Sequence, residues 1–418
     1  MYIYRHSALA LERLKRHFGA ILVTGPRQAG KTTLINETLV KGGRKRVSQV
    51  TLDDPLFLET ARNEAGSFFK DHKPPVFIDE IQYAPGLLPY IKMIADREKR
   101  NGLFFMTGSQ QFTLMQGIRL MQGISESLAG RVGIIDILGL SLREINNDPF
   151  NEPFCPDKNY IEKRKRYAPK WNYDTLWKII WRGTLPRLYA DPKFPAHDYW
   201  ASYLRTYIER DVRSLVNIGD EKKFLSFVRS TAARTGQMLN MTKLAEDADI
   251  SRTTAERWLS ILTTANIVFL LRPFHVNISK REIKAPKLYF LETGLVNYLI
   301  GWDTPKVLRN GAMGGAVFET FVIAEIIKSY INRGIQAPLY YYRDKENREI
   351  DLLIQRNGRL HPVEIKMTTN PGKNHIAAFS ALDKLSSPYT RGEGALICCC
   401  DTPVSLSAAD RALPAGYL

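Results

Sequence analysis

Glycine, lysine and threonine residues near the start of the chain stand at a spacing that suits phosphate binding. Residues 25–32 read GPRQAGKT, which matches G-x-x-x-x-G-K-[ST]. Glycines let backbone amides curl around phosphate oxygens, and the positive end of a following helix adds to the attraction. In such loops the lysine contacts the β- and γ-phosphates and the next hydroxyl binds Mg²⁺. ATP and Mg²⁺ are therefore the predicted cofactors, and the predicted contacts are Gly25, Pro26, Arg27, Gln28, Ala29, Gly30, Lys31, Thr32 and Thr33.

An acidic pair follows a second apolar segment and suits nucleotide hydrolysis. Residues 74–80 read PPVFIDE, a predicted strand that ends in Asp79 and Glu80. In ATPases with this arrangement the first carboxylate holds the Mg²⁺ shell and the second orients the attacking water. We therefore predict Asp79 as a metal ligand together with Thr32, and Glu80 as a catalytic residue.

Two further candidates for the hydrolytic site lie downstream. Residues 102–112 read GLFFMTGSQQF, a predicted third strand that ends in small polar residues. Ser109, or alternatively Thr107, could sense the γ-phosphate there. Arg131 precedes another apolar segment and could act as an arginine finger, in cis or from another subunit of a homo-oligomer. The alternative is a surface arginine at a strand end, and both interpretations are kept.

The middle of the chain has the pattern of a helix-turn-helix. Ser251 can cap a helix whose apolar residues recur at i, i+3, i+4 and i+7. These predicted core residues are Ala255, Trp258, Leu259 and Leu262. A shorter helix is expected to open at Thr242, and the apolar run 267–274 would add a β wing. The outer face carries Arg252 and Arg257, so DNA is the favoured partner over RNA, with protein docking as the alternative.

The last third of the chain holds charged residues whose strand spacing could converge on a metal ion. Residues 339–371 are predicted to form strands around an Asn-Gly hairpin, with Asp351 on one strand and Glu364 and Lys366 on its partner. Alternate residues of a strand share a face, so the two carboxylates and the amine would meet. Carboxylates suit Mg²⁺, and the lysine could activate a water. Glu319, on a predicted preceding helix, is a third candidate metal ligand.

Composition narrows the functional class. The 418 residues carry a formal charge of +16, but residues 301–418 hold 14 Lys and Arg against 12 Asp and Glu, so the basic excess lies earlier. That excess favours a nucleic-acid partner for the first two thirds. No apolar run reaches the roughly 18 residues of a membrane span, so a cytoplasmic protein without membrane contact is expected. The cysteines 398–400 are predicted to lie in a buried strand.

Several segments together resemble a known family. They are GPRQAGKTTL (25–34), TLDDP (51–55), FIDEIQ (77–82), TGSQQF (107–112) and SLAGRV (127–132), followed by YLRTYIERDV (203–212), PKLYFLETGL (286–295) and the tail. This set resembles bacterial and archaeal AAA-superfamily ATPases with a C-terminal domain of unknown function, over nearly the whole chain. The resemblance implies an ATP-binding core and leaves the cellular role open.

The tail also resembles the restriction-endonuclease-like PD-(D/E)xK core, in which Glu319 would be the helix acid. The sequence departs from that pattern at residues 348–351, which read REID where the family name has Pro-Asp. The predicted fold is thus a multidomain α/β protein. Its ranges are 1–145, a P-loop AAA-type ATPase core; 146–220, a helical lid; 221–300, a winged helix; and 301–418, a restriction-endonuclease-like domain. The predicted function is Mg²⁺-dependent ATP hydrolysis coupled to nucleic-acid binding or processing, and the alternative is an ATP-driven switch or scaffold with a non-catalytic tail.

Overall fold

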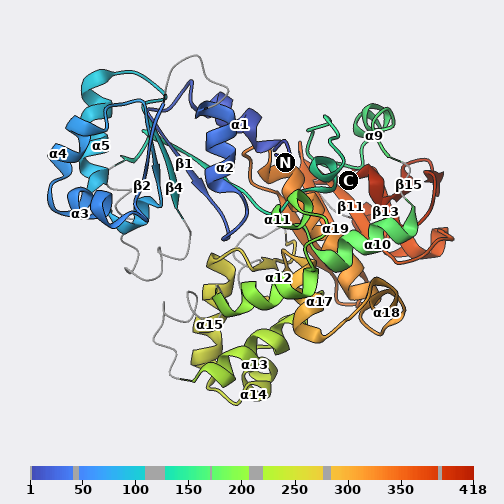
Figure 1. The fold of residues 1–418 in the computed structure, drawn as a ribbon. Helices are drawn as coiled ribbons and strands as arrows, with labels where there is room; N and C mark the ends of the chain where they lie inside the picture. Colours follow the sequence, from blue (N-terminus) through green and yellow to red (C-terminus); the bar gives the residue numbers. More distant parts are fainter. Residues whose placement is uncertain are drawn as a thin grey trace.

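The computed structural model describes residues 2–40, 47–108, 128–169, 172–206, 220–275, 284–384 and 388–418. The predicted sensor Ser109 lies outside these residues. A parallel sheet flanked by helices forms the N-terminal part, and a mixed sheet forms the C-terminal part (Figure 1). The predicted α/β architecture is therefore confirmed. No helix among the described residues is long and apolar enough to cross a membrane.

The N-terminal sheet has five parallel strands in the order β2-β3-β4-β1-β5. They are β1 (Ala20–Thr24), β2 (Ser48–Thr51), β3 (Val76–Asp79), β4 (Phe104–Gly108) and β5 (Val132–Asp136). Apolar side chains project from both faces of the sheet, because helices cover both. Helices α1 (Ser7–Leu14) and α2 (Lys31–Ile35) pack on one face, and α3 (Pro55–Asn63), α4 (Ala65–Asp71) and α5 (Leu87–Glu98) pack on the other (Figure 1). Because the strands are parallel, the C-terminal ends of β1, β3 and β4 lie at the same edge of the sheet.

The middle of the chain is mainly helical. It begins with α8 (Leu142–Ile145), α9 (Lys158–Arg164), α10 (Tyr173–Arg182), α11 (Arg187–Ala190) and α12 (Ala196–Tyr203). It continues with α13 (Glu221–Ala232), β6 (Gln237–Met238), α14 (Met241–Asp247), α15 (Arg252–Thr264), β7 (Val268–Leu271) and β8 (Lys287–Phe290). The three strands form a small antiparallel sheet in the order β6-β8-β7.

The predicted helix-turn-helix pattern is present in α14 and α15. The Ser251 side chain accepts a hydrogen bond from the backbone amide of Thr254, as expected of an N-cap. The four predicted core residues of α15 are buried. Helix α14 begins at Met241, one residue before the predicted start at Thr242, and Asn240 is its N-cap. The Asn240 side chain accepts from the amide of Lys243 and caps the helix.

The C-terminal part packs helices against a mixed sheet of order β14-β15-β13-β11-β10-β9. The helices are α17 (Thr293–Ile300), α18 (Pro305–Asn310) and α19 (Gly314–Ile331). The strands are β9 (Leu339–Arg343), β10 (Glu349–Arg356), β11 (Arg359–Ile365), β12 (Thr390–Arg391), β13 (Gly394–Cys398), β14 (Val404–Ser405) and β15 (Asp410–Pro414), and a 3₁₀ segment spans Lys373–Lys384. The predicted Asn-Gly hairpin joins β10 to β11, with positive φ at Asn357 and Gly358. The cysteines 398–400 are buried, as predicted.

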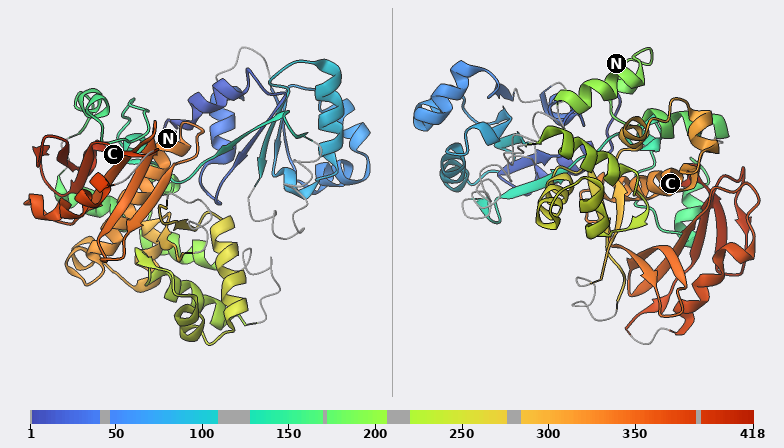
Figure 2. Two further views of the ribbon diagram at one scale, coloured as in Figure 1. Left: turned by 180° about the vertical axis from the view of Figure 1, so that it is seen from behind. Right: turned by 90° about the horizontal axis from the view of Figure 1, so that it is seen from below.

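A large hydrophobic core lies after the N-terminal sheet. It extends from Leu138 to Leu418 and includes residues of α10, α13, α15, α17, α19 and the C-terminal sheet. A second, smaller core packs residues of β10, β11 and β13 with the 3₁₀ segment, and the domain boundaries near residues 220 and 300 stay predictions. Figure 2 shows that the N-terminal parallel sheet lies apart from the C-terminal sheet, with the helical middle joining them.

Candidate functional site

The loop between β1 and α2 has the backbone that phosphate binding requires. Gly25 has φ +144°, and a Cβ there would lie 2.1 Å from the carbonyl oxygen of Ile137, so only glycine fits. Lys31 is buried at the start of α2, and its Nζ donates to the carbonyls of Gly25 and Pro26 at 3.1 Å. Burial lowers the pKa of Lys31, whereas the nearby carboxylates of Glu80 and Asp79 act to raise it. The amine is thus held at the loop, within reach of phosphates.

Thr32 and Asp79, the two predicted magnesium ligands and hereafter the magnesium pair, face each other at the sheet edge. The Thr32 hydroxyl donates to Asp79 Oδ1 at 2.9 Å, although 47 residues separate them. The Thr107 hydroxyl also donates to Asp79, and burial raises the Asp79 pKa while these hydrogen bonds lower it. Hydroxyl and carboxylate oxygens are donors that Mg²⁺ prefers, and the Asp79 carboxylate is buried beside the Thr32 hydroxyl, so the pair fits that ion. Thr107 thus contacts the carboxylate of Asp79, and the sensing role of Thr107 stays a prediction.

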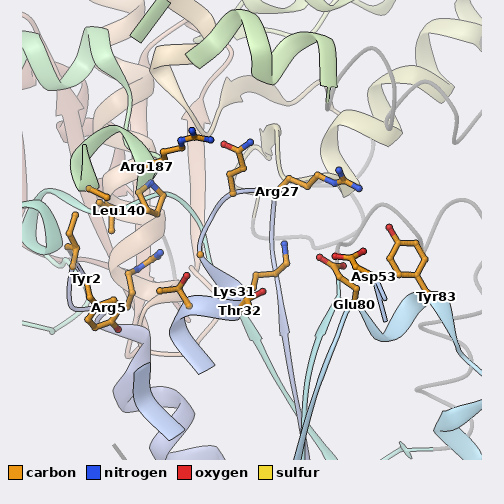
Figure 3. Close-up of a pocket in the computed structure, with 16 residues that line it drawn as sticks. Tyr2, Arg5, Arg27, Lys31, Thr32, Asp53, Glu80, Tyr83, Leu140 and Arg187 are labelled. Carbon is orange, nitrogen blue, oxygen red and sulfur yellow. The ribbon is translucent and has the colours of Figure 1, made fainter. Parts of the chain in front are cut away.

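Glu80 is held in an uncommon backbone conformation beside Lys31. Its φ of 59° lies in the left-handed region, which non-glycine residues rarely adopt. The backbone amide of Glu80 donates to Thr107 Oγ1 at 3.0 Å, and the side-chain amide of Gln82 donates to its carboxylate. Figure 3 shows the Glu80 carboxylate next to Asp53 and near the Lys31 amine. Glu80 therefore faces the space where a γ-phosphate and a water would lie.

A cavity of about 710 Å³, hereafter the nucleotide cavity, opens above these groups (Figure 3). Its volume is in the range of pockets that hold nucleotide-sized ligands. Besides the phosphate loop, its lining includes the N-terminal segment, the end of the sheet and α11, with Tyr2, Arg5, Asp53, Tyr83, Leu140 and Arg187 among the residues. Sequence analysis missed these residues, since none belongs to a motif with a fixed spacing from the loop.

Arg5 supports the phosphate loop from behind. It is buried, and its guanidinium donates to the carbonyl of Ala29 at 2.6 Å and to that of Leu138 at 2.8 Å. Its Nε lies 3.0 Å from Glu144 Oε1, an ion pair between residues 139 positions apart. Arg5 thus ties the loop to the segment that leaves the N-terminal sheet.

The hairpin in the C-terminal part brings the predicted residues Asp351, Glu364 and Lys366 together. Lys366 Nζ lies 2.7 Å from Glu364 Oε1 and 3.4 Å from Asp351 Oδ2. Asp351 also accepts from the backbone amide of Ile365 at 3.0 Å. Glu319, on α19, enters the same region but contacts a different strand: Tyr289 of β8 donates to its carboxylate at 2.6 Å.

A lysine that the sequence analysis did not consider lies among these carboxylates. Lys287 Nζ is 2.6 Å from Glu349 Oε1, 3.5 Å from Glu319 Oε1 and 3.6 Å from Asp351 Oδ1. We call the four acids, Glu319, Glu349, Asp351 and Glu364, the acidic cluster. Among the described residues, no three His, Cys, Asp or Glu side chains come close enough to hold a metal ion. The predicted ligands Glu319, Asp351 and Glu364 are therefore neighbours but do not form a closed metal site. The ammonium groups of Lys287 and Lys366 lie between them.

Burial dominates the electrostatics of the acidic cluster. Burial, followed by the charge of Asp351, raises the pKa of Glu364 to about 8 and that of Glu319 to about 7. Glu364 Oε2 is buried without a hydrogen-bond partner among the described residues. A buried carboxylate oxygen without a hydrogen-bond partner is stabilised by binding a proton or a cation.

Comparison with known proteins agrees with the nucleotide site. Residues 17–146 match a family described as an AAA domain, and residues 173–306 and 314–418 match two domains of unknown function, DUF8612 and DUF4143. The uncharacterized protein Rv2008c of Mycobacterium tuberculosis is 30% identical over 377 residues, which cover 88% of this chain and 74% of that protein. The chain belongs to this family of AAA-domain proteins. The uncharacterized protein Mb2031c of Mycobacterium bovis gives the same values.

Solved structures similar to this AAA-domain protein include two ATP-related proteins. The Walker-type ATPase PABY2304 of Pyrococcus abyssi matches with 13% identity and a TM-score of 0.41, over 70% of this chain and 94% of that one. AMPPCP-bound DnaA from Aquifex aeolicus matches with 14% identity and a TM-score of 0.30, over 62% of this chain and 85% of that one. The predicted AAA-type ATPase core with a C-terminal domain of unknown function is confirmed by the family matches.

Arg131 of this AAA-domain protein does not lie at the nucleotide cavity. It directly precedes β5, which runs parallel to β1 with Val132 opposite Ala20. The phosphate loop follows the other end of β1, so Arg131 is at the opposite edge of the sheet. Its Nε lies 2.5 Å from Asp96 Oδ1, and both side chains are exposed. The structure therefore contradicts a finger acting in cis and agrees with a surface arginine, while action in trans stays a prediction.

Proposed function

We propose that this chain binds MgATP and hydrolyses it. The proposal rests on one arrangement: the amine of Lys31 and the carboxylate of Glu80 flank the magnesium pair at the floor of the nucleotide cavity. Phosphoryl transfer depends mainly on positioning and charge stabilisation, which these groups supply. The Lys31 amine would exchange its two carbonyl partners for the β- and γ-phosphates. Glu80 would orient a water toward the γ-phosphorus, and bound Mg²⁺ would neutralise charge on the phosphate oxygens.

Removal of the metal tests this proposal. Phosphate release from ATP by the purified chain is expected with excess Mg²⁺ and expected to fall to the level of the buffer when EDTA exceeds the metal. Restoring Mg²⁺ should restore the rate, because the magnesium pair persists without nucleotide. Phosphate release that is equal with and without chelator would contradict the assignment of the magnesium pair.

We further propose that the module from α13 to β8 is a winged helix that binds DNA through α15. Its element order is helix, strand, two helices and two strands, which supports that fold. The outer face of α15 exposes Arg252 and Arg257, and Arg252 Nε donates to Glu256 Oε1, one turn along the same helix, at 2.9 Å. A helix fits the major groove of B-DNA but not the narrow, deep major groove of double-stranded RNA, which favours DNA.

DNA binding by this face should depend steeply on salt. Replacing both Arg252 and Arg257 with alanine is expected to lower the slope of log affinity against log salt by about 2, since each phosphate contact contributes about 0.9. The measurement is fluorescence anisotropy with a duplex over a salt series. Arg97→Ala, an exposed arginine on α5, is the matched control and should leave the slope unchanged. A slope unaffected by the double variant, or no affinity at low salt, would favour a protein-docking module instead.

We also propose a restriction-endonuclease-like fold for residues 301–418. Helix α19 is followed by β9, β10 and β11, then by a 3₁₀ segment and β13, and β13 lies parallel to β11. The pair Asp351 and Glu364 with Lys366 stands at the end of the central hairpin, where that fold places its charged residues. Processing of the DNA held by α15 would then depend on whether this site can admit a metal.

A further inference from the structure

Lys287 lies in the acidic cluster although it comes from a different module. It is the first residue of β8, the central strand of the small sheet β6-β8-β7. Its side chain is 5% exposed, and its amine contacts Glu349, Glu319 and Asp351. Each of those acids belongs to the C-terminal domain, on α19 or β10. The contact therefore joins the proposed winged helix to the proposed nuclease-like site.

Carboxylates surround the amine of Lys287 in this position. Its Nζ lies 2.6 Å from Glu349, 3.5 Å from Glu319 and 3.6 Å from Asp351. A buried ammonium ion surrounded by carboxylates satisfies them electrostatically, as a metal ion would. A divalent ion bound to Glu319 Oε1, Glu349 Oε1 and Asp351 Oδ1 would need these oxygens at about 2.0–2.6 Å, in the place that the amine now occupies, so the two cations would compete for that side of the cluster.

A second residue of β8 strengthens this contact. Tyr289 is two residues after Lys287, so both side chains leave the strand on the same face. The Tyr289 hydroxyl donates to Glu319 Oε1 at 2.6 Å. The small sheet is also fastened to the C-terminal domain by its flanking segment: the amide of Phe274 donates to the carbonyl of Tyr341 at 2.6 Å. Lys287 thus reaches the acidic cluster only while β8 is docked there.

We propose that Lys287 closes the acidic cluster to divalent metal ions, and that Mg²⁺ or Mn²⁺ can enter only when β8 moves away. The proposal rests on the proposed restriction-endonuclease-like fold of residues 301–418. The blocking cation, Lys287, comes from the proposed winged helix. That module would then also control metal access, because a partner that displaces the small sheet would expose the carboxylates. Lys366, which contacts Asp351 and Glu364 from β11's own end, would stay in place.

Mn²⁺ binding in the absence of nucleotide tests the proposal. The background variant is Thr32→Val, which removes one residue of the magnesium pair and so isolates the C-terminal site. Free Mn²⁺ is measured by its electron paramagnetic resonance signal. The Thr32→Val parent should bind no Mn²⁺, whereas the same protein with Lys287→Met should bind about one ion per chain. Lys287→Arg, which keeps the positive charge, should bind none. Adding Asp351→Asn to Lys287→Met should remove the gained site.

Two outcomes would overturn the proposal. One is a parent protein that already binds Mn²⁺ at a site lost in Asp351→Asn. The other is a folded Lys287→Met protein that gains no metal. Lys287→Gln is the second variant, since its amide can still hydrogen-bond to the carboxylates if methionine prevents folding, and Mn²⁺ should then raise its melting temperature but not that of the parent.

Cleavage separates this proposal from the proposed function. A Lys287→Met protein that binds Mn²⁺ but leaves DNA intact would support the closure of the site and contradict a cutting role for the tail. Failure of the ATPase assignment would leave the result unaffected, because no nucleotide is present.

Discussion

Glu80→Gln is expected to lower the rate of ATP hydrolysis by about 10²–10⁴-fold while ATP binding is retained. Glutamine has the size of glutamate but cannot accept a proton from the attacking water. The backbone conformation at residue 80 should persist, since the hydrogen bond from its backbone amide to Thr107 Oγ1 does not involve the side chain. Steady-state phosphate release gives the rate, and a fluorescent ATP analogue gives the affinity.

Two comparisons make this result specific. Lys31→Ala should abolish nucleotide binding itself, because the amine is the group that reaches the phosphates. Glu98→Gln, at the exposed end of α5, should change neither rate nor affinity. Equal ATP affinity in the parent and Lys31→Ala would contradict the phosphate-binding assignment, and an undiminished rate in Glu80→Gln would remove Glu80 from catalysis.

The nucleotide site could be predicted because its parts follow strand ends. The phosphate loop and Asp79 are far apart in sequence, but both come after parallel strands, so they meet at the same edge. The same rule bears on Arg131, for which a finger and a surface arginine were both kept. A residue that precedes a parallel strand lies at the opposite end of the sheet, and Arg131 immediately precedes β5, which excludes action in cis and leaves action in trans as a prediction.

The acidic cluster could be predicted only in part. The side-chain alternation of β10 and β11 brings Asp351, Glu364 and Lys366 together, and the hairpin turn is marked by Asn-Gly. Lys287 could not be found that way, since its partners are 32 to 64 positions away and on other elements. In the sequence, Lys287 is simply a lysine that precedes an apolar segment, and nothing in that segment marks it as buried. Only the packing of the small sheet on the C-terminal domain makes it a partner of the carboxylates.

A buried ion pair at the junction of the domains also escaped prediction. Lys328, on α19, is 1% exposed, and its Nζ lies 2.8 Å from Glu325 Oε1. The amine also donates to the carbonyl of Leu140 at 3.0 Å and to the hydroxyl of Thr184 at 2.9 Å. Leu140 lines the nucleotide cavity, so these bonds join the lining of the cavity to α19. Helix α19 also carries Glu319 of the acidic cluster, which makes it the element shared by both sites.

Lys328→Met is expected to lower the free energy of unfolding by about 3–5 kcal/mol, the usual cost of removing one partner of a buried ion pair. Methionine fills a similar volume, so the loss should come from Glu325, whose carboxylate would stay buried without its cation. Glu325 Oε2 would keep only the hydrogen bond from the amide of Leu142, at 2.7 Å. Urea denaturation followed by circular dichroism measures the change from the shift in midpoint.

Restoring charge balance should recover much of this loss. The double variant Lys328→Met with Glu325→Gln removes both charges, and its midpoint should lie between those of Lys328→Met and the parent, since the glutamine oxygen can still accept from Leu142. Lys158→Met, an exposed lysine on α9, should leave the midpoint within the range of surface substitutions, about 0.5 kcal/mol. A Lys328→Met midpoint equal to that of Lys158→Met would show that the pair contributes nothing to stability. In that case, Lys328 would serve only to position Leu140 and Thr184 beside the nucleotide cavity.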